Sequence, residues 1–248
     1  MSSPTFAWPA HVSVHKLSAQ DGQRQIAEQV HGLLSLALQQ QGRAVLAVSG
    51  GQSPIGLFQH LRGFDLPWQQ VTVTLVDDRQ VAPDHPDSNA RLVREHLLQD
   101  RAAVARFVPL VESPLPLTVD HWLANAERAS ELLQDIGAAD VAILGMGSDG
   151  HFASIFPQAR ERLQALDLQQ SKACLAMHLD PLPAGAAHHR LTQTLAHLAR
   201  SRAWILPLWS SEKIGVLQEA RLHPERGWPV SALLNPSIQT PLSIWMSP

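Results

Sequence analysis

Histidine, aspartate and glycine residues gather in residues 139–157, which read A-D-V-A-I-L-G-M-G-S-D-G-H-F-A-S-I-F-P. Histidine titrates close to neutrality, so His151 can take a proton from water and act as a general base. Asp149 lies two residues earlier and can orient the imidazole ring. Three glycines let a ligand approach the main chain of this turn closely: Gly145, Gly147 and Gly150. The stretch predicts proton-transfer chemistry. A glycine-rich turn with a capping Asp and a surface His is the alternative.

A second group of charges is Asp77-Asp78-Arg79, directly after the apolar residues 71–76. Adjacent carboxylates beside a guanidinium are costly to gather at a strand end unless they are solvated or used. Asp77 is therefore a second candidate to orient His151. Arg79 is a candidate to stabilise an oxyanion, together with backbone N–H groups of the 145–150 turn. A solvated charged loop is the alternative for this group.

A third group of residues favours binding of an anion such as a phosphate. Residues 49–54 read S-G-G-Q-S-P between a predicted strand and a predicted helix, where free N–H groups point at a ligand. The turn supplies Ser49, Gly50, Gly51 and Ser53 as binding candidates. Arg190 and Lys213 fall near the starts of two later predicted helices and add positive charge. The turn matches neither a Walker loop nor the dinucleotide fingerprint. A turn that binds nothing remains the alternative.

Alternating helix and strand patterns must position these groups. Helices are predicted over 20–41, 54–62, 118–136 and 229–234, from Ser88 or Asn89 to Leu98, from Arg190 and from Ser210. Strands are predicted over 45–48, 71–76, 106–109, 141–144, 173–178, 203–208 and 242–246. The alternation predicts a three-layer α/β/α fold around a doubly wound, mostly parallel sheet. Without an internal repeat or linker, residues 1–248 are expected to form one domain.

Composition limits the classes of function. Hydrophobic residues make up 45% of the 248 residues, which is enough for a sizeable core. The net charge of −3 and the lack of a long basic run argue against nucleic acid as a partner. Cys174 is the only cysteine, which excludes an internal disulfide and fits a reducing, cytoplasmic location. No apolar run reaches the length of a membrane span, and no secretion signal is visible.

Four stretches in this order resemble the 6-phosphogluconolactonase family, within the wider glucosamine-6-phosphate isomerase/6-phosphogluconolactonase group. They are residues 49–54, residues 77–79 with 85–89, residues 145–157, and Arg190-Leu191-Thr192 with Lys213. The resemblance covers about residues 44–220, and the ordered set of motifs is highly specific.

The resemblance implies a Rossmann-like fold and hydrolysis of 6-phospho-D-glucono-1,5-lactone to 6-phosphogluconate, the second step of the pentose phosphate pathway. It implies neither a metal nor an organic cofactor, and we expect a monomer or a small homo-oligomer. Two positions depart from the family pattern. Asp78 stands where the family usually has Glu, which shortens the arm of that carboxylate. Phe152 stands where the family usually has Thr, so a hydrogen bond beside the His is lost or replaced.

Two other functions remain to be compared with the lactonase. An amino-sugar-6-phosphate deaminase/isomerase of the same group resembles the chain at the Gly-Gly loop and at Asp149-Gly150-His151. That family has an acidic residue shortly after the His, where this chain reads S-I-F-P, and a Tyr at the position of Arg79. A non-catalytic sugar-phosphate sensor is the other alternative, and no basic helix-turn-helix segment supports it.

Overall fold

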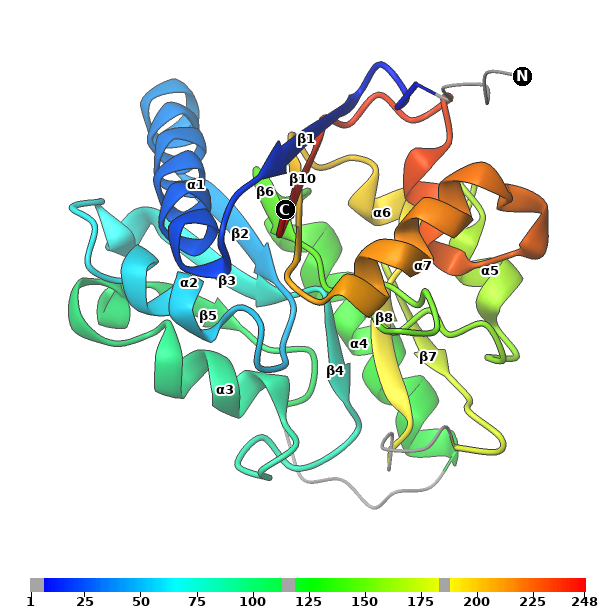
Figure 1. Cartoon of the computed structure of the whole chain (residues 1–248). Helices are drawn as coiled ribbons and strands as arrows, with labels where there is room; N and C mark the ends of the chain where they lie inside the picture. The colour runs from blue at the N-terminus through cyan, green and yellow to red at the C-terminus, as the bar shows by residue number, and fades with distance from the viewer. Residues whose placement is uncertain (1–6, 113–118, 183–187) are drawn as a thin grey trace.

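A seven-stranded sheet forms the centre of the molecule (Figure 1). The computed structural model describes residues 7–112, 119–182 and 188–248. The strands follow the order β1-β10-β9-β6-β2-β3-β5, and each pair of neighbours is parallel. Neighbouring strands in this sheet are separate along the chain, so helical crossovers must join them. The sequence-based prediction of a doubly wound parallel sheet is therefore confirmed.

The elements alternate along most of the chain as the sequence predicts, but β1, β4, β8 and α5 were not predicted, and within the described residues no α-helix separates β3 from β4 or β7 from β8. The α-helices are α1 (Ala19–Gln41), α2 (Ile55–Leu61), α3 (Asn89–His96), α4 (Val119–Ile136), α5 (Arg162–Leu166), α6 (Leu195–Leu198) and α7 (Ser211–Leu222). The strands are β1 (Val12–Lys16), β2 (Ala44–Val48), β3 (Val71–Leu75), β4 (Asp77–Arg79), β5 (Arg106–Val108), β6 (Val141–Ile143), β7 (Cys174–Met177), β8 (Arg190–Gln193), β9 (Trp204–Leu208) and β10 (Leu242–Met246). Short 3₁₀ helices include Pro229–Leu234, which the sequence predicts as a helix.

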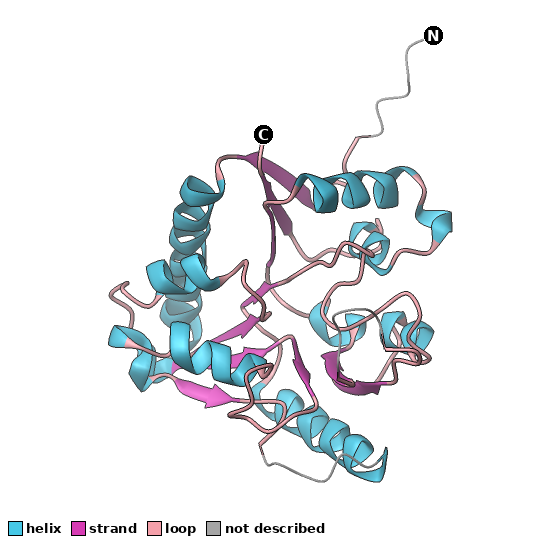
Figure 2. Ribbon diagram, turned by 60° about the horizontal axis from the view of Figure 1, so that its bottom comes forward, coloured by secondary structure: helices cyan, strands magenta, loops and turns pink. Residues whose placement is uncertain are grey.

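Helices cover both faces of the large sheet. In Figure 1 helices α1, α2 and α3 lie on one side of it, whereas α4, α5, α6 and α7 lie on the other. The turned view in Figure 2 shows the helices surrounding the strands. Every residue of β2, β6 and β9 is buried, which explains why these segments are continuous apolar runs. No helix in the described ranges is both long enough and apolar enough for a bilayer crossing.

A second sheet, which the sequence did not predict, packs beside the first. It has three strands in the order β4-β8-β7, and both pairings are antiparallel. The prediction that Arg190 opens a helix is wrong: residues 190–193 form β8, and the helix α6 begins only at Leu195. The spacing of Leu191, Leu195 and Leu198 fits a helix, but pairing on both edges overrides that local pattern.

Val76 joins the two sheets. It lies between β3 of the large sheet and β4 of the small sheet. Its N–H group donates to the carbonyl of Val48 at 2.9 Å, and its own carbonyl accepts from Gln193 at 2.8 Å. One residue thus bonds to β2 of the large sheet through its N–H group and to β8 of the small sheet through its carbonyl group. This connection places Asp77-Asp78-Arg79 next to Arg190-Leu191-Thr192 in paired strands.

Candidate active site

The candidate site lies where the chain changes direction across the large sheet. β2 and β6 are neighbours in the large sheet. The next strand of this sheet after β2 is β3, on one side of the pair, and the next after β6 is β9, on the other side. Open α/β sheets bind ligands at the carboxyl ends of strands at such a switch point. Ser49 follows β2 and Gly145 follows β6, and the N–H group of Gly145 donates to Ser49 Oγ at 2.9 Å. A pocket of about 260 Å³ opens there.

Most of the candidate residues predicted from the sequence line this pocket. The lining includes Ser49, Gly50, Gly51, Ser53, Asp77, Arg79, Gly147, His151 and Lys213. Asp149 and Arg190 do not line the pocket. Asp149 contacts His151, and Arg190 is the strand partner of Arg79, and both of those residues do line it. The structure therefore brings together, at one edge of the sheet, segments that lie far apart in the sequence.

Asp149 holds the ring of His151. Its Oδ1 lies 2.5 Å from Nδ1 of His151 and also accepts from the backbone N–H of His151 at 3.2 Å. Burial raises the pKa of Asp149, but the hydrogen bonds and charge interaction with His151 outweigh it, so that this pKa is lowered. An ionised Asp149 fixes the proton on Nδ1 and leaves Nε2 as the proton acceptor. Asp149, rather than Asp77, is the carboxylate in contact with the ring.

Gly147 and Phe156 determine where the imidazole lies. The ring of His151 stacks on Phe156, with 4.1 Å between ring centroids and 29° between ring planes. A Cβ atom at position 147 would lie 2.2 Å from Cε1 of His151 and 2.7 Å from Oδ1 of Asp149. Glycine is therefore required at position 147 because the His-Asp pair packs directly against the main chain.

Some backbone N–H groups of this turn are used within the protein. Gly147 donates to the carbonyl of His151 at 2.9 Å, and Gly150 donates to the carbonyl of Gly147 at 3.1 Å. The N–H groups of Met146 and Ser148 have no acceptor within the described parts of the chain. The oxyanion role of the turn, together with Arg79 in the pocket lining, stays a prediction.

Backbone strain is present on the pocket wall. Ala153 has a φ of +48°, a left-handed conformation that is unfavourable for a residue with a side chain. It follows Phe152, whose ring is fully buried and whose backbone forms bridges to Met146 and Ile155. Strained residues of this kind concentrate at functional sites. The position at which the family usually has Thr is here part of the core.

Asp77 and Asp78 have different surroundings. Oδ2 of Asp77 accepts from the hydroxyl of Ser154 at 2.5 Å, so a hydroxyl two residues after Phe152 contacts this carboxylate. Asp78 is fully buried and accepts from the backbone N–H groups of Arg79, Asn89 and Ala90 at 2.7–3.2 Å. Burial raises the pKa of Asp78 to about 7 against the opposing effect of these N–H groups. Asp78 thus holds the first turn of α3 against β4 and is not part of the pocket lining.

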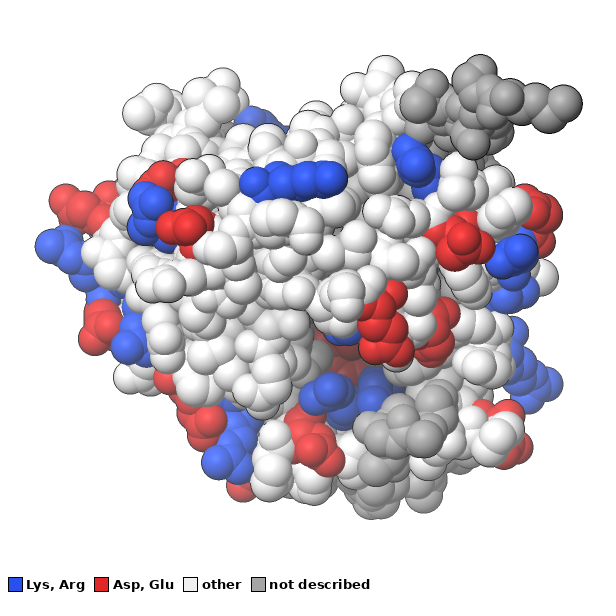
Figure 3. Space-filling model, viewed as in Figure 1, with Lys and Arg blue, Asp and Glu red and all other residues white. Residues whose placement is uncertain are grey.

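Two arginines lie side by side in the small sheet. Arg79 and Arg190 are register partners in β4 and β8. Burial, and then the positive charge of Arg79, lowers the pKa of Arg190 to about 10. Within the described residues no carboxylate forms an ion pair with either guanidinium. Two neighbouring cations without a carboxylate partner favour the approach of an anion. Figure 3 shows blue and red side chains gathered in a hollow over the region of β4.

The loop after β2 offers backbone donors. Within the described parts of the chain, the N–H groups of Gly50, Gly51 and Gln52 have no acceptor. Gly51 has a φ of +88°, a conformation suited to glycine. Lys213, in the first turn of α7, lines the same pocket. Free amides together with an ammonium group form a suitable site for a phosphate.

The sequence did not identify several other lining residues as site candidates: Gln52, Asn89, Met146, Ala153 and Pro207. Asn89 is the most informative. Ser88 caps α3, because its Oγ accepts from the N–H of Arg91 at 3.3 Å. Asn89 is therefore free to donate from Nδ2 to the carbonyl of Asp77 at 2.9 Å. Its buried Oδ1 has no hydrogen-bond partner among the described residues and lies so close to Gly50 that a Cβ atom there would be 1.9 Å away. The sequence signal that could have identified Asn89 was its position in the H-P-D-S-N stretch, directly after the helix cap Ser88.

One cluster outside the pocket has ligand types suited to a metal. His85, Asp87 and His188 each offer a ligand atom, and these atoms lie within 4.8 Å of one another. Nε2 of His188 contacts Oδ2 of Asp87 directly at 2.8 Å, so the two groups satisfy each other without an ion. We therefore interpret the cluster as a hydrogen-bonded charge pair.

Fold and pocket define an α/β protein with a His-Asp pair and a glycine-rich loop of free backbone N–H groups at its topological switch point. The chain belongs to the family described as glucosamine-6-phosphate isomerases/6-phosphogluconolactonase, whose model matches residues 18–241. It is similar to a 6-phosphogluconolactonase of Pseudomonas aeruginosa, with 39% identity over 233 residues, 93% of this chain and 92% of the relative. It is also similar to a 6-phosphogluconolactonase of Neisseria meningitidis, with 38% identity over 88% of this chain and 91% of the relative.

A solved structure shows the same arrangement. The crystal structure of a 6-phosphogluconolactonase from Shewanella baltica matches with a TM-score of 0.87 and 33% identity. The match covers 98% of this chain and 100% of that chain. The fold resemblance inferred from the sequence motifs is therefore confirmed over nearly the whole chain.

Proposed function

We propose that the protein is a lactone hydrolase that converts 6-phospho-D-glucono-1,5-lactone into 6-phosphogluconate, the second step of the oxidative pentose phosphate pathway. One observation carries the proposal: the pocket is lined both by His151, which Asp149 holds by its Nδ1, and by an anion-binding loop with Lys213. A base and a phosphate site in one pocket suit a sugar-phosphate lactone. The family membership and the similarity to two lactonases support the same conclusion.

The first step adds water to the lactone carbonyl. Nε2 of His151 takes a proton from a water molecule while the water oxygen forms a bond to C1. The C1 oxygen becomes negatively charged, and the guanidinium of Arg79 in the pocket lining stabilises that charge. Asp149 stabilises the imidazolium that forms, because its carboxylate accepts a hydrogen bond from the N–H group at Nδ1.

The second step opens the ring. The electrons of the C1 oxyanion re-form the carbonyl, and the bond between C1 and the ring oxygen breaks. The ring oxygen leaves as an alkoxide and takes the proton that His151 gained, which restores the neutral base. The product has a carboxylic acid at C1, which ionises near neutrality, and a hydroxyl at C5. Water is the only co-reactant.

The phosphate supplies most of the binding energy in this proposal. Its oxygens accept from the N–H groups of Gly50 and Gly51, from Ser49 and Ser53, and from Lys213. Arg190, beside Arg79, adds positive charge behind the pocket wall. Charge-assisted hydrogen bonds of this kind each contribute about 1.5–3 kcal/mol. We expect the unphosphorylated lactone to be a poor substrate for this reason.

We further propose that the enzyme acts in the cytoplasm as a monomer or small homo-oligomer, on a free small molecule, without nucleic acid, metal or organic cofactor. The chemistry described above needs only a base, hydrogen-bond donors and water. Cys174 is a buried thiol, and burial raises its pKa to about 12, so it does not compete as a nucleophile.

The test is an assay with two substrates. Freshly prepared 6-phosphogluconolactone and glucosamine 6-phosphate are offered to the protein in a pH-stat, and spontaneous lactone hydrolysis is subtracted. We expect rapid hydrolysis of the lactone and no reaction with the amino sugar. Release of ammonia from glucosamine 6-phosphate, without lactonase activity, would instead assign the chain to the deaminase/isomerase branch of the family.

A further inference from the structure

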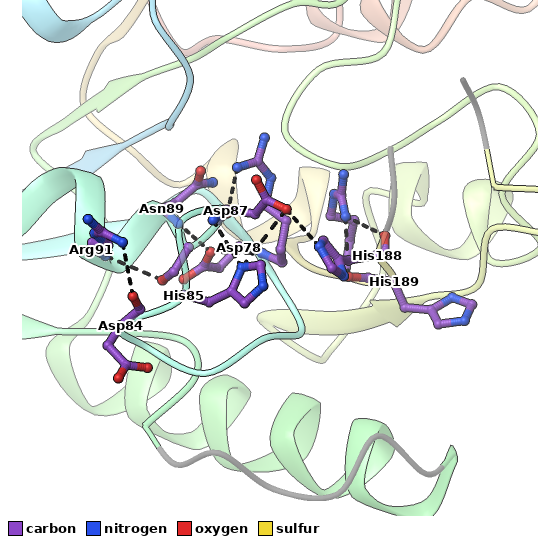
Figure 4. A network of polar contacts seen from close by, with 11 residues as sticks. Asp78, Asp84, His85, Asp87, Asn89, Arg91, His188 and His189 are labelled. Atoms are coloured by element: carbon purple, nitrogen blue, oxygen red, sulfur yellow. Dashed lines mark hydrogen bonds and ion pairs between the residues drawn. The ribbon is translucent and has the colours of Figure 1, made fainter. Parts of the chain in front are cut away.

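Two loops meet beside the paired arginines, and their contact involves side chains. Asp87 lies in the loop between β4 and α3, and His188 directly precedes β8. Nε2 of His188 donates to Oδ2 of Asp87 at 2.8 Å, across 101 positions of sequence. Figure 4 shows the two labelled side chains pointing toward each other, with His85 beside them.

The backbone carbonyls of the same two residues hold the arginines. Nη1 of Arg79 donates to the carbonyl oxygen of Asp87 at 2.7 Å. Nη1 of Arg190 donates to the carbonyl oxygen of His188. Each member of the Asp87–His188 pair therefore has one function in its side chain, which links the loops, and another in its main chain, which orients a guanidinium.

The arginines need such support because they repel each other. They are register partners in neighbouring strands, and within the described residues neither has a carboxylate ion pair. Two neighbouring positive charges favour side-chain conformations that move the guanidinium groups apart. A carbonyl acceptor on each guanidinium opposes that movement without neutralising the charge, so both cations remain available to an anion.

His85 supports the pair from the other side. Its Nδ1 accepts from the backbone N–H of Asp87 at 3.1 Å, and its ring meets that of His188 edge to face at 5.3 Å between centroids. The Asp87 side chain is half exposed, and exposed ion pairs contribute little to overall stability. The arrangement is therefore better suited to fixing local geometry than to stabilising the fold.

We infer that Asp87 and His188 are positioning residues: their side-chain contact fixes the two carbonyl groups that orient Arg79 and Arg190 toward the anionic substrate. The inference rests on the proposed function, in which these arginines interact with the sugar-phosphate lactone. Asp87 and His188 do not touch the substrate themselves. Their loss changes binding of the anion and leaves the His151 base intact.

The experiment compares His188→Ala, Asp87→Ala and the double variant with the wild-type protein. For each, KM and kcat are measured with 6-phosphogluconolactone, and Kd is measured for 6-phosphogluconate by calorimetry. His188→Gln tests rescue, because the amide of Gln can donate to Asp87 in place of Nε2. His223→Ala is the matched control, because Nδ1 of His223 lies 3.2 Å from Glu225 in an exposed pair that does not line the pocket.

We expect KM and Kd to rise roughly three- to tenfold in either single variant, the range for residues that act through another group. The kcat should fall by no more than a similar factor: Arg79 stabilises the C1 oxyanion in the proposed mechanism, whereas the His151 base is unchanged. The double variant should be no worse than the single variants, since both break one contact. His188→Gln should recover most of the affinity, and the thermal midpoint and His223→Ala should match the wild type.

An unchanged KM and Kd in His188→Ala would overturn the inference, as would equal damage in His188→Gln. A fall in kcat together with a lower thermal midpoint would show a general structural role and would also overturn it. Failure of the proposed function is a separate result: the wild-type protein would then neither hydrolyse the lactone nor bind 6-phosphogluconate, and the inference would fail with it.

Discussion

The two halves of the pocket are built in different ways. On the base side, the contacts of His151 with Asp149, Gly147 and Phe156 all lie within one short turn after β6. On the cation side, Arg79 and Arg190 come from two strands of the small sheet, and the loops that hold them are 101 positions apart. The base is therefore positioned by local sequence, and the cations by the tertiary fold.

The two halves should therefore respond differently to substitution. A single substitution in the turn acts directly on the ring of His151, the proposed base, because the ring packs against the main chain. A single substitution near the arginines acts through strand pairing or loop contacts, and we expect it to change binding of the anion more than proton transfer. The largest expected effect is at His151.

Replacing the base gives the largest effect. His151→Ala should lower kcat by roughly 10²–10⁴, the usual contribution of a general base. Binding of 6-phosphogluconate, measured by calorimetry, should change little because the base makes few ground-state contacts. In the wild type, kcat/KM should rise with pH as the imidazole loses its proton and then level off.

The matched control for that substitution is His178→Ala. His178 is also a half-exposed histidine paired with a carboxylate, Glu161, at 2.7 Å, but it does not line the pocket. Its kcat should match the wild-type value. A folded His151→Ala protein with near wild-type kcat would move the search for the base to Asp77 or Asp149.

Gly147→Ala should damage the base side without removing any functional group. The added methyl group would lie 2.2 Å from the ring of His151, so the ring must move. A displacement of about 1 Å in a reacting group can cost roughly 10²-fold in rate, and we expect kcat to fall by roughly 10–10². Gly32→Ala is the control, because a Cβ there meets nothing within 4 Å. Equal kcat values for the two variants would show that the ring is not confined by the main chain.

Arg190→Ala should act on the cation side. We expect binding of substrate and of 6-phosphogluconate to weaken by about 1.5–3 kcal/mol, the range for a charge-assisted hydrogen bond. The kcat should change less than KM, in contrast to Gly147→Ala. Arg24→Ala, on the exposed surface of α1, is the control. Because Arg190 does not line the pocket directly, an unchanged KM would remove it from the site.

Asp78→Asn should change the pH dependence of stability. Burial raises the pKa of Asp78 to about 7, above the value of 3.8 for a free Asp. The folded state thus binds this proton more tightly, and its stabilisation is present at low pH and lost as pH rises through the folded pKa. Between about pH 5 and pH 8, the wild-type free energy of unfolding should fall by about 2–3 kcal/mol relative to Asp78→Asn.

Urea denaturation at both pH values measures this difference. Asp65→Asn is the control, because the Asp65 side chain is almost fully exposed. Identical pH profiles for the wild type and Asp78→Asn would mean that the three N–H donors keep Asp78 ionised throughout.

Chelation should have no effect on either half. Dialysis against EDTA should leave kcat and KM unchanged, because the proposed reaction uses a histidine base and hydrogen-bond donors. The His85–Asp87–His188 cluster is the place to examine if activity is lost and a divalent ion restores it. That result would also revise the interpretation of the cluster as a charge pair.

The sequence predicted the base side more completely than the cation side, for a physical reason. The order of strands and helices follows from hydrophobic periodicity, and the His151 turn is a contiguous motif after a buried strand. Arg190 was placed at a helix start because its neighbours have helical spacing. β8 pairs with β4, which lies more than 100 positions earlier in the sequence, and with β7, which lies more than ten positions earlier. No local sequence pattern reveals either pairing.

The roles of individual side chains also depend on the tertiary fold, and the local sequence did not reveal them. The sequence left both Asp77 and Asp149 as candidates to orient His151. The structure shows that Asp149 contacts the imidazole ring, whereas Asp77 contacts Ser154. Asp78 was recognised as a departure from the family pattern, but two of its three backbone contacts come from the first turn of α3, whose position relative to β4 depends on the fold. Asn89 was considered only as a helix cap, and its position in the pocket follows from the cap being Ser88.

Val76 has a consequence for the size of substrate that the pocket accepts. Its N–H group is bonded to the large sheet, which carries His151 in the segment after β6, and its carbonyl to the small sheet, which carries Arg79 and Arg190. The backbone spacing between the segments that carry the proton acceptor and the paired guanidinium groups is thus set by the hydrogen bonds of a single residue. Side chains adjust only the last part of that distance, so we expect the main chain to limit the length of substrate that can reach both groups at once.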